Sequence, residues 1–550
     1  MTTTTHAPQH RAPTTDAGSA PLAGLGTMIR FVLRRDRIRL PVWVIGHGLF
    51  VVYITAALPQ LAPSERDLAG LTSLLTQPVA RMFTGPALGL DDPTYERFFA
   101  AGYAPYLFIM AALMNIFLVT RHTRAEEQSG RAELLRASVL GRHTMLTATL
   151  VVAALANLAA AAVVTALTLG AGYPTAGSVL VGLATGATGM VFAGIAAITA
   201  QINEFSRAAS GMAGALLGAA FVMRALGDMA EAGGSALSWA SPLGWAAQTG
   251  PYVHDRWWPL ALSAGLAAIT IVIAFLLQDR RDFGASLMPP RPGNTRAHPM
   301  LGYPLGLAAR LQRGGFLGWG FGILALGIID GLFTQAMLDA GDAMPPELRA
   351  VFGTEQLLEG YVGFLASFVA ILVAAYVVYA IQTLRTEESS GRADTVLATP
   401  VSRAGWLGSH LTVVALGAML ILVITGLGTG IAAAAVTGEG YLIGDVLVSH
   451  LATAPAILVV LGLTVGFFGF LPRFMTLIGW LAVAIIAIVD LFADLLDLPE
   501  AFRALSPLWH LPKIPVEDFA VTPFLVLLGI AVVTAVLGLA GFRRREINFR

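Results

Sequence analysis

Long apolar runs separated by short polar segments dominate this sequence. Each run has the ~20 mostly apolar residues that an α-helix needs to cross the hydrocarbon core of a bilayer. The runs lie at about 40–59, 101–120, 144–170, 175–200, 208–226, 257–277, 314–335, 361–382, 407–435, 442–468, 474–495 and 519–542. This pattern predicts an all-α integral membrane protein with about 12 transmembrane helices.

The composition also indicates that most of the surface of the chain faces lipid rather than water. Only 12% of the 550 residues are charged, against ~25% in soluble domains, while 56% are apolar and the mean hydropathy is +0.71. The Lys+Arg and Asp+Glu counts are both 34, so no net positive field favours nucleic acid. We therefore expect the lipid bilayer as a partner and no nucleic acid.

The sequence offers few residues for catalysis, nucleotide binding or metal binding. It has no cysteine, and the histidines after the N-terminal tail lack the i,i+4 spacing of metal ligands, so no metal site is predicted. The single lysine, Lys513, has prolines on both flanks and no glycine-rich turn before it, which excludes a P-loop. We expect no catalytic residue and no cofactor in this chain.

An internal repeat divides the sequence. Residues 124–137 (RAEEQSGRAELLRA) match residues 385–398 (RTEESSGRADTVLA) at an offset of 261, and each half contains six apolar runs. Two halves of equal topology predict parallel six-helix repeats related by a pseudo-two-fold axis along the membrane normal. The predicted organisation is a disordered cytoplasmic tail (1–26), a first half (27–283), a cytoplasmic linker without regular structure (284–306) and a second half (307–550).

The distribution of basic residues predicts the orientation. With the N-terminus inside, 26 of the 34 Lys and Arg residues fall on the cytoplasmic side and eight on the other. Basic residues near the ends of spans are retained in the cytoplasm. Both termini are therefore predicted to be cytoplasmic.

The repeated charged segment is the most specific motif. It contains, in the two halves, Arg124, Glu126, Glu127, Gly130 and Arg131, and Arg385, Glu387, Glu388, Gly391 and Arg392. If helical, Glu127 with Arg131 and Glu388 with Arg392 form i,i+4 pairs, as in a solvated helix at the membrane surface. The recurrence of the motif in both halves favours a second interpretation, in which it docks a partner protein.

The second copy, continuing through Leu397-Ala398-Thr399-Pro400 to Arg403, resembles the signature of ABC-2-type ABC transporter permeases. Two fused halves over roughly 27–550 are similar to actinobacterial exporters of polyketide antibiotics, the tetronasin-type and mycobacterial multidrug permeases. The resemblance implies a bacterial plasma-membrane exporter of bulky hydrophobic compounds. Each charged segment would be a coupling helix on one of two separate ATP-binding subunits, which would hold ATP and Mg²⁺. The first copy has Val139 where the second has Pro400, so docking there is expected to differ in detail.

The resemblance also implies an elbow helix at 27–39, short re-entrant helices within 227–256 and 496–518, and a substrate path between the halves. Spans 2, 5, 8 and 11 would line this path with Met and aromatic side chains, which suit varied apolar ligands. The candidates are Tyr106, Met110, Met114, Phe117, Met212, Phe221, Phe364, Phe368, Tyr379, Met475 and Trp480. The competing interpretation of these residues is lipid-facing or helix-packing surface.

An ion-coupled secondary transporter is the alternative function. It predicts buried carboxylates at corresponding mid-membrane positions in the two halves. Asp330 and Asp490 lie in non-equivalent spans, so the sequence does not supply such a pair.

Overall fold

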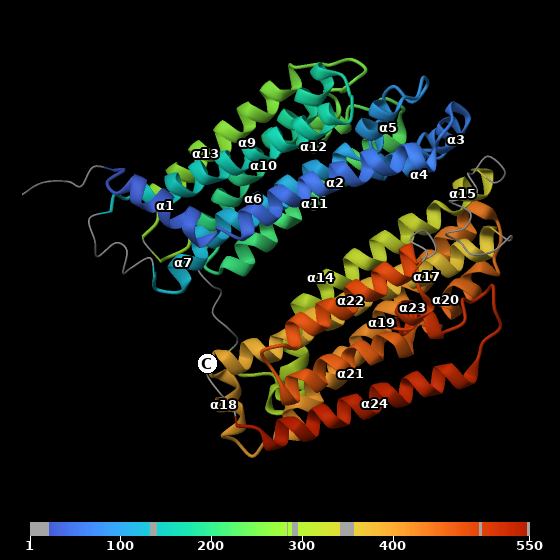
Figure 1. Cartoon of the computed structure of the whole chain (residues 1–550). Coiled ribbons are helices and arrows are strands. Elements are labelled where there is room, and N and C mark those ends of the chain that lie inside the picture. Colours follow the sequence, from blue (N-terminus) through green and yellow to red (C-terminus); the bar gives the residue numbers. More distant parts are fainter. Residues whose placement is uncertain are drawn as a thin grey trace, which may run out of the picture. The chain divides into compact units, whose positions relative to one another are not determined.

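The protein is described by a computed structural model, in which every regular element of the described part is helical (Figure 1). The described residues are 21–131, 140–282, 284–288, 295–340, 357–493 and 498–546. The chain forms two compact units, unit 1 from residues 1–60 and 81–291, and unit 2 from residues 61–80 and 292–550.

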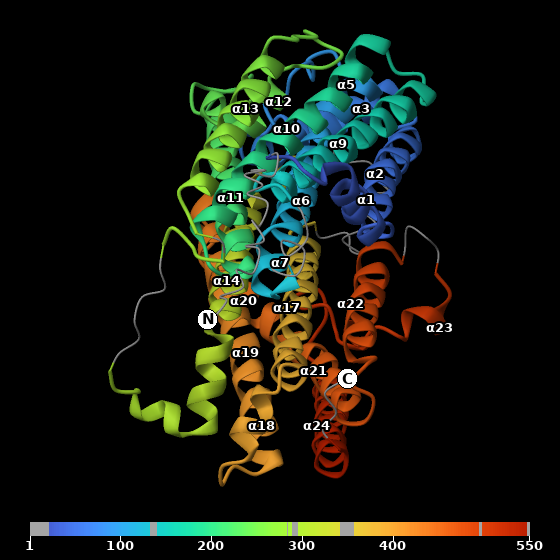
Figure 2. The same cartoon turned by 90° about the vertical axis from the view of Figure 1, so that its left-hand side faces the viewer.

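Long helices that run side by side build each unit (Figures 1 and 2). The helices of unit 1 are α1 (Leu25–Arg35), α2 (Arg39–Leu61), α4 (Pro78–Thr84, from Arg81 onward), α5 (Tyr95–Gly102), α6 (Ala104–His122), α7 (Arg124–Gln128), α9 (Thr144–Gly170), α10 (Thr175–Ile202), α11 (Ser206–Ala230), η1 (Ser238–Ala240), α12 (Pro242–Ala247) and α13 (Pro259–Asp279). Those of unit 2 are α3 (Glu65–Leu75), η2 (Pro299–Gly302), α14 (Pro304–Leu332), α15 (Thr334–Ala340), α17 (Leu357–Ser389), α18 (Arg392–Leu397), α19 (Arg403–Thr437), α20 (Leu442–Ala452), α21 (Ala454–Phe470), α22 (Met475–Phe492), α23 (Glu500–Arg503), η4 (Leu508–His510) and α24 (Val521–Arg544).

Eleven of the twelve predicted spans are confirmed as helices long and apolar enough to cross a membrane. The twelfth, α22, is apolar but has 18 residues, or ~27 Å of helix against a hydrocarbon core of ~30 Å. The predicted span at 442–468 is divided into α20 and α21 at Thr453, because Pro455 in the first turn of α21 has no backbone N–H to continue the helix.

Two predicted boundaries are corrected. The segment 284–306 is partly regular, since η2 and the start of α14 lie within it and Pro304 occupies the first helical turn, where proline is favourable. Its beginning packs on unit 1, where the N–H of Met288 donates to the carbonyl of Ile202 at 3.2 Å. Of the predicted tail, residues 1–20 lie outside the described part, and α1 already begins at Leu25.

The predicted elbow helix is present as α1, an amphipathic helix that packs on α9 in unit 1. Met28 and Val32 are buried one turn apart on its apolar face. The short helix η1 with α12 and, in unit 2, α23 with η4 occupy the segments where re-entrant helices were predicted.

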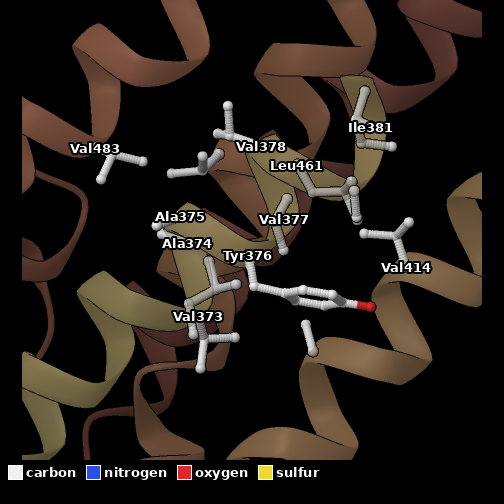
Figure 3. Close-up of a cluster of buried hydrophobic side chains, with 14 of the residues drawn as sticks. Val373, Ala374, Ala375, Tyr376, Val377, Val378, Ile381, Val414, Leu461 and Val483 are labelled. Carbon is white, nitrogen blue, oxygen red and sulfur yellow. The ribbon is translucent and has the colours of Figure 1, made fainter. Parts of the chain in front are cut away.

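Buried side chains of α17 form the centre of unit 2. Figure 3 shows Val373, Tyr376 and Val377 of this helix with Val414 of α19 and Leu461 of α21 beside them. All five side chains are buried. The Tyr376 hydroxyl has no hydrogen-bond partner among the described residues.

In unit 1, a polar pair joins α6 to α9 inside the apolar interior. The Asn115 side-chain amide donates to Asn157 Oδ1 at 2.9 Å, and the Asn157 amide donates back to Asn115 Oδ1 at 3.0 Å. Each amide also donates to its own helix, at the carbonyls of Ala111 and Ala153. A Cβ at Gly189 of α10 would lie only 2.0 Å from Asn157 Oδ1, so glycine is needed for this close approach.

Candidate functional site

The repeated charged motif lies at one end of each unit, which we call the motif end. In unit 1 the motif begins with α7, in which Arg124 is almost fully buried. The Arg124 guanidinium donates from Nε to the carbonyl of Glu204 at 2.7 Å and from Nη1 to the carbonyl of Ala285 at 3.0 Å. Arg124 therefore fixes α7 to the end of α10 and to the segment after α13.

Glu127 links the motif to the end of a distant helix. Its carboxylate accepts from Arg281 Nη2 at 2.5 Å and Nη1 at 2.9 Å, a bidentate geometry. It also accepts from Arg124 Nη1 at 2.5 Å. Since Arg281 follows the last residue of α13 closely, this pair ties the motif to the end of the sixth span.

Glu126 makes a second set of contacts. Its side chain is fully buried and accepts from Arg35, at the end of α1, and from Arg131 Nε at 3.1 Å. The two acidic residues thus link the motif to both α1 and α13. Both carboxylates form ion pairs with arginines of unit 1.

The second copy repeats these pairings in unit 2. Glu388 accepts from Arg545 Nη1 at 2.5 Å and Nη2 at 2.9 Å, and Arg385 lies 3.5 Å from it. Glu387 accepts from Arg392 Nη2 at 2.8 Å. In both copies the second glutamate therefore pairs with the arginine after the sixth span, and the first glutamate pairs with the arginine that follows the glycine.

The predicted i,i+4 pairs are wrong. Gly130 and Gly391 adopt left-handed conformations, with φ of 71° and 72°, which end the preceding helix and turn the chain. The following arginine then reaches the first glutamate of the motif, five residues earlier, and the second glutamate turns inward to the distant arginine. The acidic pair is buried rather than solvated, so neither carboxylate of a pair is an exposed docking group.

The exposed part of each motif is the turn around its glycine, which we call the tip. Arg131 and Arg392 are 53% and 57% exposed, and the polar residues just before each glycine are exposed as well. In unit 2 the chain continues from the tip into α18, and Pro400 follows it in an exposed turn. The counterpart of Pro400 in the first copy, Val139, lies outside the described residues.

The predicted substrate-path residues divide by exposure within their own units. Met114 and Met475 are 0% exposed and belong to the packed interiors of units 1 and 2. Four residues are exposed, namely Tyr106, Phe117, Tyr379 and Trp480. The remaining five are half-buried, namely Met110, Met212, Phe221, Phe364 and Phe368. The four predicted path residues of α6 therefore do not form one accessible face, because Met114 is buried in the interior of unit 1.

Several of these aromatic rings pack against neighbours. Phe364 and Phe368 stack with their centroids 6.2 Å apart, and the ring of Tyr379 lies 5.9 Å from that of Trp319. The guanidinium of Arg224 lies 5.0 Å from the ring of Phe221.

The opposite end of each unit carries a carboxylate, and Asp228, the counterpart of Asp490, was not recognised in the sequence. Asp228 of α11 accepts from Arg224 Nη1 at 3.1 Å and from Ser238 Oγ at 2.6 Å. Asp490 of α22 accepts from Ser506 Oγ at 2.6 Å. Asp228 is the third residue from the end of α11 and Asp490 is the third from the end of α22, the fifth spanning helix of each half, so a corresponding pair does exist. It lies at the helix ends rather than at mid-span.

The pairing partners of the motif that were missed from the sequence are Arg35, Arg281 and Arg545. The dipeptides Arg280-Arg281 and Arg544-Arg545 were visible as part of the repeat, but their distance along the chain from the glutamates concealed the pairing. Among the described residues, no group of three or more His, Cys, Asp or Glu is arranged to hold a metal ion.

Comparison with known proteins identifies the family. The family model for "Multidrug efflux system permease Rv1217c, C-terminal domain" matches residues 25–277 and 301–543. The "Multidrug efflux system permease protein Rv1217c" of Mycobacterium tuberculosis (strain ATCC 25618 / H37Rv) is 36% identical over 548 residues, covering 98% of this chain and 97% of that protein. The predicted similarity to mycobacterial multidrug permeases is thereby confirmed. The chain belongs to the family of multidrug efflux system permeases that this model describes.

Proposed function

We propose that this chain is the membrane-spanning subunit of an ABC-2-type exporter, driven by two copies of a separate ATP-binding subunit that holds ATP and Mg²⁺. The observation that carries the proposal is the repeated scaffold at the motif end. In each unit, a buried Glu–Arg pair anchors an exposed polar tip to the end of the sixth span. Two equivalent tips fit two copies of one partner.

The scaffold gives a route for transmitting motion. Each tip is joined covalently to the second span and, through Glu127 or Glu388, to the end of the sixth. A rigid group of this kind moves as one body when its tip is pushed, which is how packed elements carry a displacement. Closing and opening of the ATPase dimer would shift spans 2 and 6 of the first half, and 8 and 12 of the second, together.

The proposed arrangement is two parallel six-helix repeats with a pseudo-two-fold axis along the membrane normal, and with both termini in the cytoplasm of a bacterium. The equal pairings in the two copies and the excess of arginine at the motif end support it. Fusing cytochemical tags to either terminus and testing their accessibility in intact and in opened cells checks the orientation.

The proposed cargo is a bulky hydrophobic compound, in keeping with the multidrug efflux named for the mycobacterial relative. Tyr106, Phe117, Tyr379 and Trp480 remain the strongest candidates for the path, because their rings are exposed in their own units. Broad aromatic surfaces bind varied apolar molecules without a fixed polar pattern.

Co-expression and purification with a candidate ATP-binding subunit from the same organism tests the proposal. We expect a complex of one chain with two ATPase subunits, and no ATP binding by the isolated chain. Ion-coupled transport is the second candidate, although the corresponding aspartates Asp228 and Asp490 lie at helix ends rather than at the mid-span positions that it predicts. Drug efflux from vesicles that is driven by a proton gradient and needs no ATPase would favour that candidate and refute the first.

A further inference from the structure

A groove of about 660 Å³ lies at the motif end of unit 2. It runs between η2, the first turns of α14 and the first half of α19, the helix that follows α18. The exposed side chains of Arg310 and Arg313 line one part of it. The apolar part of its wall includes Met300, Leu301, Phe316, Val413, Leu416 and Leu420. The groove is therefore amphipathic, and its charged groups are accessible.

The charged part of the groove contains hydrogen-bond donors without acceptor partners. Neither Arg310 nor Arg313 forms an ion pair or a hydrogen bond with any described residue. His298 Nδ1 accepts from the N–H of Met300 at 3.3 Å, which leaves Nε2 to carry the proton and donate. No Asp or Glu is among the described residues that line the groove. Two unpaired guanidinium groups, with a third donor in the same groove, are complementary to a phosphate group.

The arginine pair is arranged differently in the two units. The two arginines correspond to Arg34 and Arg37 of unit 1, at the offset of 276 between the two segments that the family model matches. In unit 1 the helix α1 ends at Arg35, so Arg34 lies on α1 and Arg37 in the turn before α2. In unit 2 both arginines lie within the continuous helix α14, three residues apart and therefore on one face. We therefore expect a site of this kind in unit 2.

The uncharged stretch of α14 places this part of the groove at the edge of the hydrocarbon core. Residues 314–329, between Arg313 and Asp330, carry no charge and span ~24 Å of helix, against a core of ~30 Å. Shifting α14 in one direction would draw Arg313 into the core, shifting it in the other would draw Asp330 in, and both cost free energy. Arg313 therefore lies at the boundary of the core, next to the headgroup region.

The apolar part of the groove continues from this boundary along α19. Leu416 and Leu420 lie one helical turn apart and are 63% and 49% exposed. Such side chains on a spanning helix contact acyl chains, which are as apolar as leucine. At ~30 Å³ per water molecule, the volume of the groove corresponds to about twenty waters, so the groove has room for a headgroup and the first part of its acyl chains.

We propose that this groove binds the headgroup of an anionic phospholipid from the leaflet at the motif end. The phosphate lies against the guanidinium groups of Arg310 and Arg313, with His298 Nε2 as a further donor. The acyl chains follow Leu416 and Leu420 into the core. A lipid bound in this way would hold η2 and the start of α14 at the membrane surface. The proposal goes beyond the proposed function and does not depend on it.

Native mass spectrometry of the full chain, purified with added lipid, tests the binding. The probes are phosphatidylglycerol and phosphatidylethanolamine with identical acyl chains. We expect one phosphatidylglycerol to be retained in preference to phosphatidylethanolamine, whose ammonium group cancels the charge of its phosphate. Equal retention of the two lipids would overturn the assignment of an anionic headgroup. Soluble glycerophosphoglycerol is the third arm, and its retention without any retained lipid would overturn the assignment of a membrane lipid.

Charge variants locate the lipid. Arg310→Gln/Arg313→Gln should lower the preference for phosphatidylglycerol about fivefold for each arginine, the usual effect of one basic residue at an anionic membrane surface. Arg310→Lys/Arg313→Lys keeps both charges and should keep most of the preference. Arg34→Gln/Arg37→Gln removes the same charge from exposed arginines of unit 1. It is the matched control and should show the wild-type preference.

Ala309→Trp tests the groove itself. Ala309 is exposed and lines the groove, so an indole ring there occupies the space without altering the charge. Retention of phosphatidylglycerol should fall, and this variant decides the question if the glutamine variant does not fold. The site is refuted if both groove variants retain the lipid as the wild type does, or if the unit 1 control loses the preference to the same extent as the groove variants.

The lipid site and the proposed function can fail separately. If phosphatidylglycerol is retained selectively but no complex with the ATPase forms, the headgroup site stands and the proposed function fails. If the complex forms but retains the two lipids equally, the proposed function stands and the headgroup site fails.

Discussion

The arginines Arg281 and Arg545 have the same carboxylate partners in the two units but very different surroundings. Arg281 also donates from Nε to Gln201 Oε1 at 2.6 Å and from Nη1 to the carbonyl of Ala285 at 3.0 Å. Arg545 instead lies 5.0 Å from the ring of Phe468 and 5.1 Å from that of Phe542, and its Nε has no partner among the described residues. One guanidinium is held by several polar groups, and the other mainly by Glu388 and two aromatic faces.

This difference shows that a repeated ion pair need not be equally strong or equally replaceable in both copies. Attraction between charges grows as the surrounding dielectric falls, and so does the cost of leaving one charge unpaired. The aromatic surroundings of Arg545 should therefore make its pair with Glu388 the more critical of the two.

The largest effect is expected for Glu388→Ala. This change leaves Arg545 without its carboxylate partner in a largely apolar environment, and should lower the free energy of unfolding by about 3 kcal/mol. The thermal unfolding midpoint in a fixed detergent measures it. The double variant Glu388→Ala/Arg545→Met removes both charges and should recover most of the loss, since an apolar pair is often neutral in such a place. An equally unstable double variant would show that the charges are not the cause.

Glu127→Ala should cost less, about 1–2 kcal/mol, because Arg281 keeps Gln201 and Ala285 as partners. The same unfolding measurement applies. Adding Gln201→Phe gives Arg281 an aromatic neighbour in place of the amide, and should increase the cost of losing Glu127. If Glu127→Ala lowers the free energy of unfolding as much as or more than Glu388→Ala does, the proposed difference between the two ion pairs is wrong.

The tip arginines should affect coupling rather than stability. Arg131→Ala and Arg392→Ala remove exposed side chains whose ion pairs are worth less than ~1 kcal/mol. Unfolding should hardly change, while drug-stimulated ATPase activity of the complex should fall. Lysine at either position keeps the charge and serves as the control. Full stimulation in both alanine variants would exclude these residues from the ATPase contact.

The smallest effect is expected at the substrate-path residues. Phe117→Trp or Tyr379→Trp should shift the relative resistance to different drugs without abolishing efflux, because one exposed ring contributes part of a broad apolar surface. Leu158→Trp, on the exposed surface of α9, is the matched control. Identical resistance profiles for all three variants at equal expression would place the path elsewhere.

The sequence predicted the parts of the fold that depend on local patterns. The length of each apolar run located eleven spans, and the repeat located both motifs. The arginine that pairs with each motif glutamate was not predictable, because the pairing depends on which distant residues the fold brings together. Glu127 could be matched to Arg131 by spacing, whereas its contact with Arg281, 154 residues away, forms because the fold brings the segment after α13 to α7. Asp228 was overlooked because an aspartate four residues after Arg224 looks like an ordinary helix pair.

The amide pair Asn115–Asn157 restricts how unit 1 can change shape. Sliding α6 along α9 by one helical turn would break both reciprocal hydrogen bonds and leave two carboxamides unsatisfied in an apolar interior. The corresponding position in α17, 261 residues later, holds Tyr376, whose hydroxyl forms no hydrogen bond with any described residue. Under the proposed function, the first half would respond to its ATPase by tilting α6 and α9 as a single lever, while α17 in the second half keeps the freedom to translate along its neighbour.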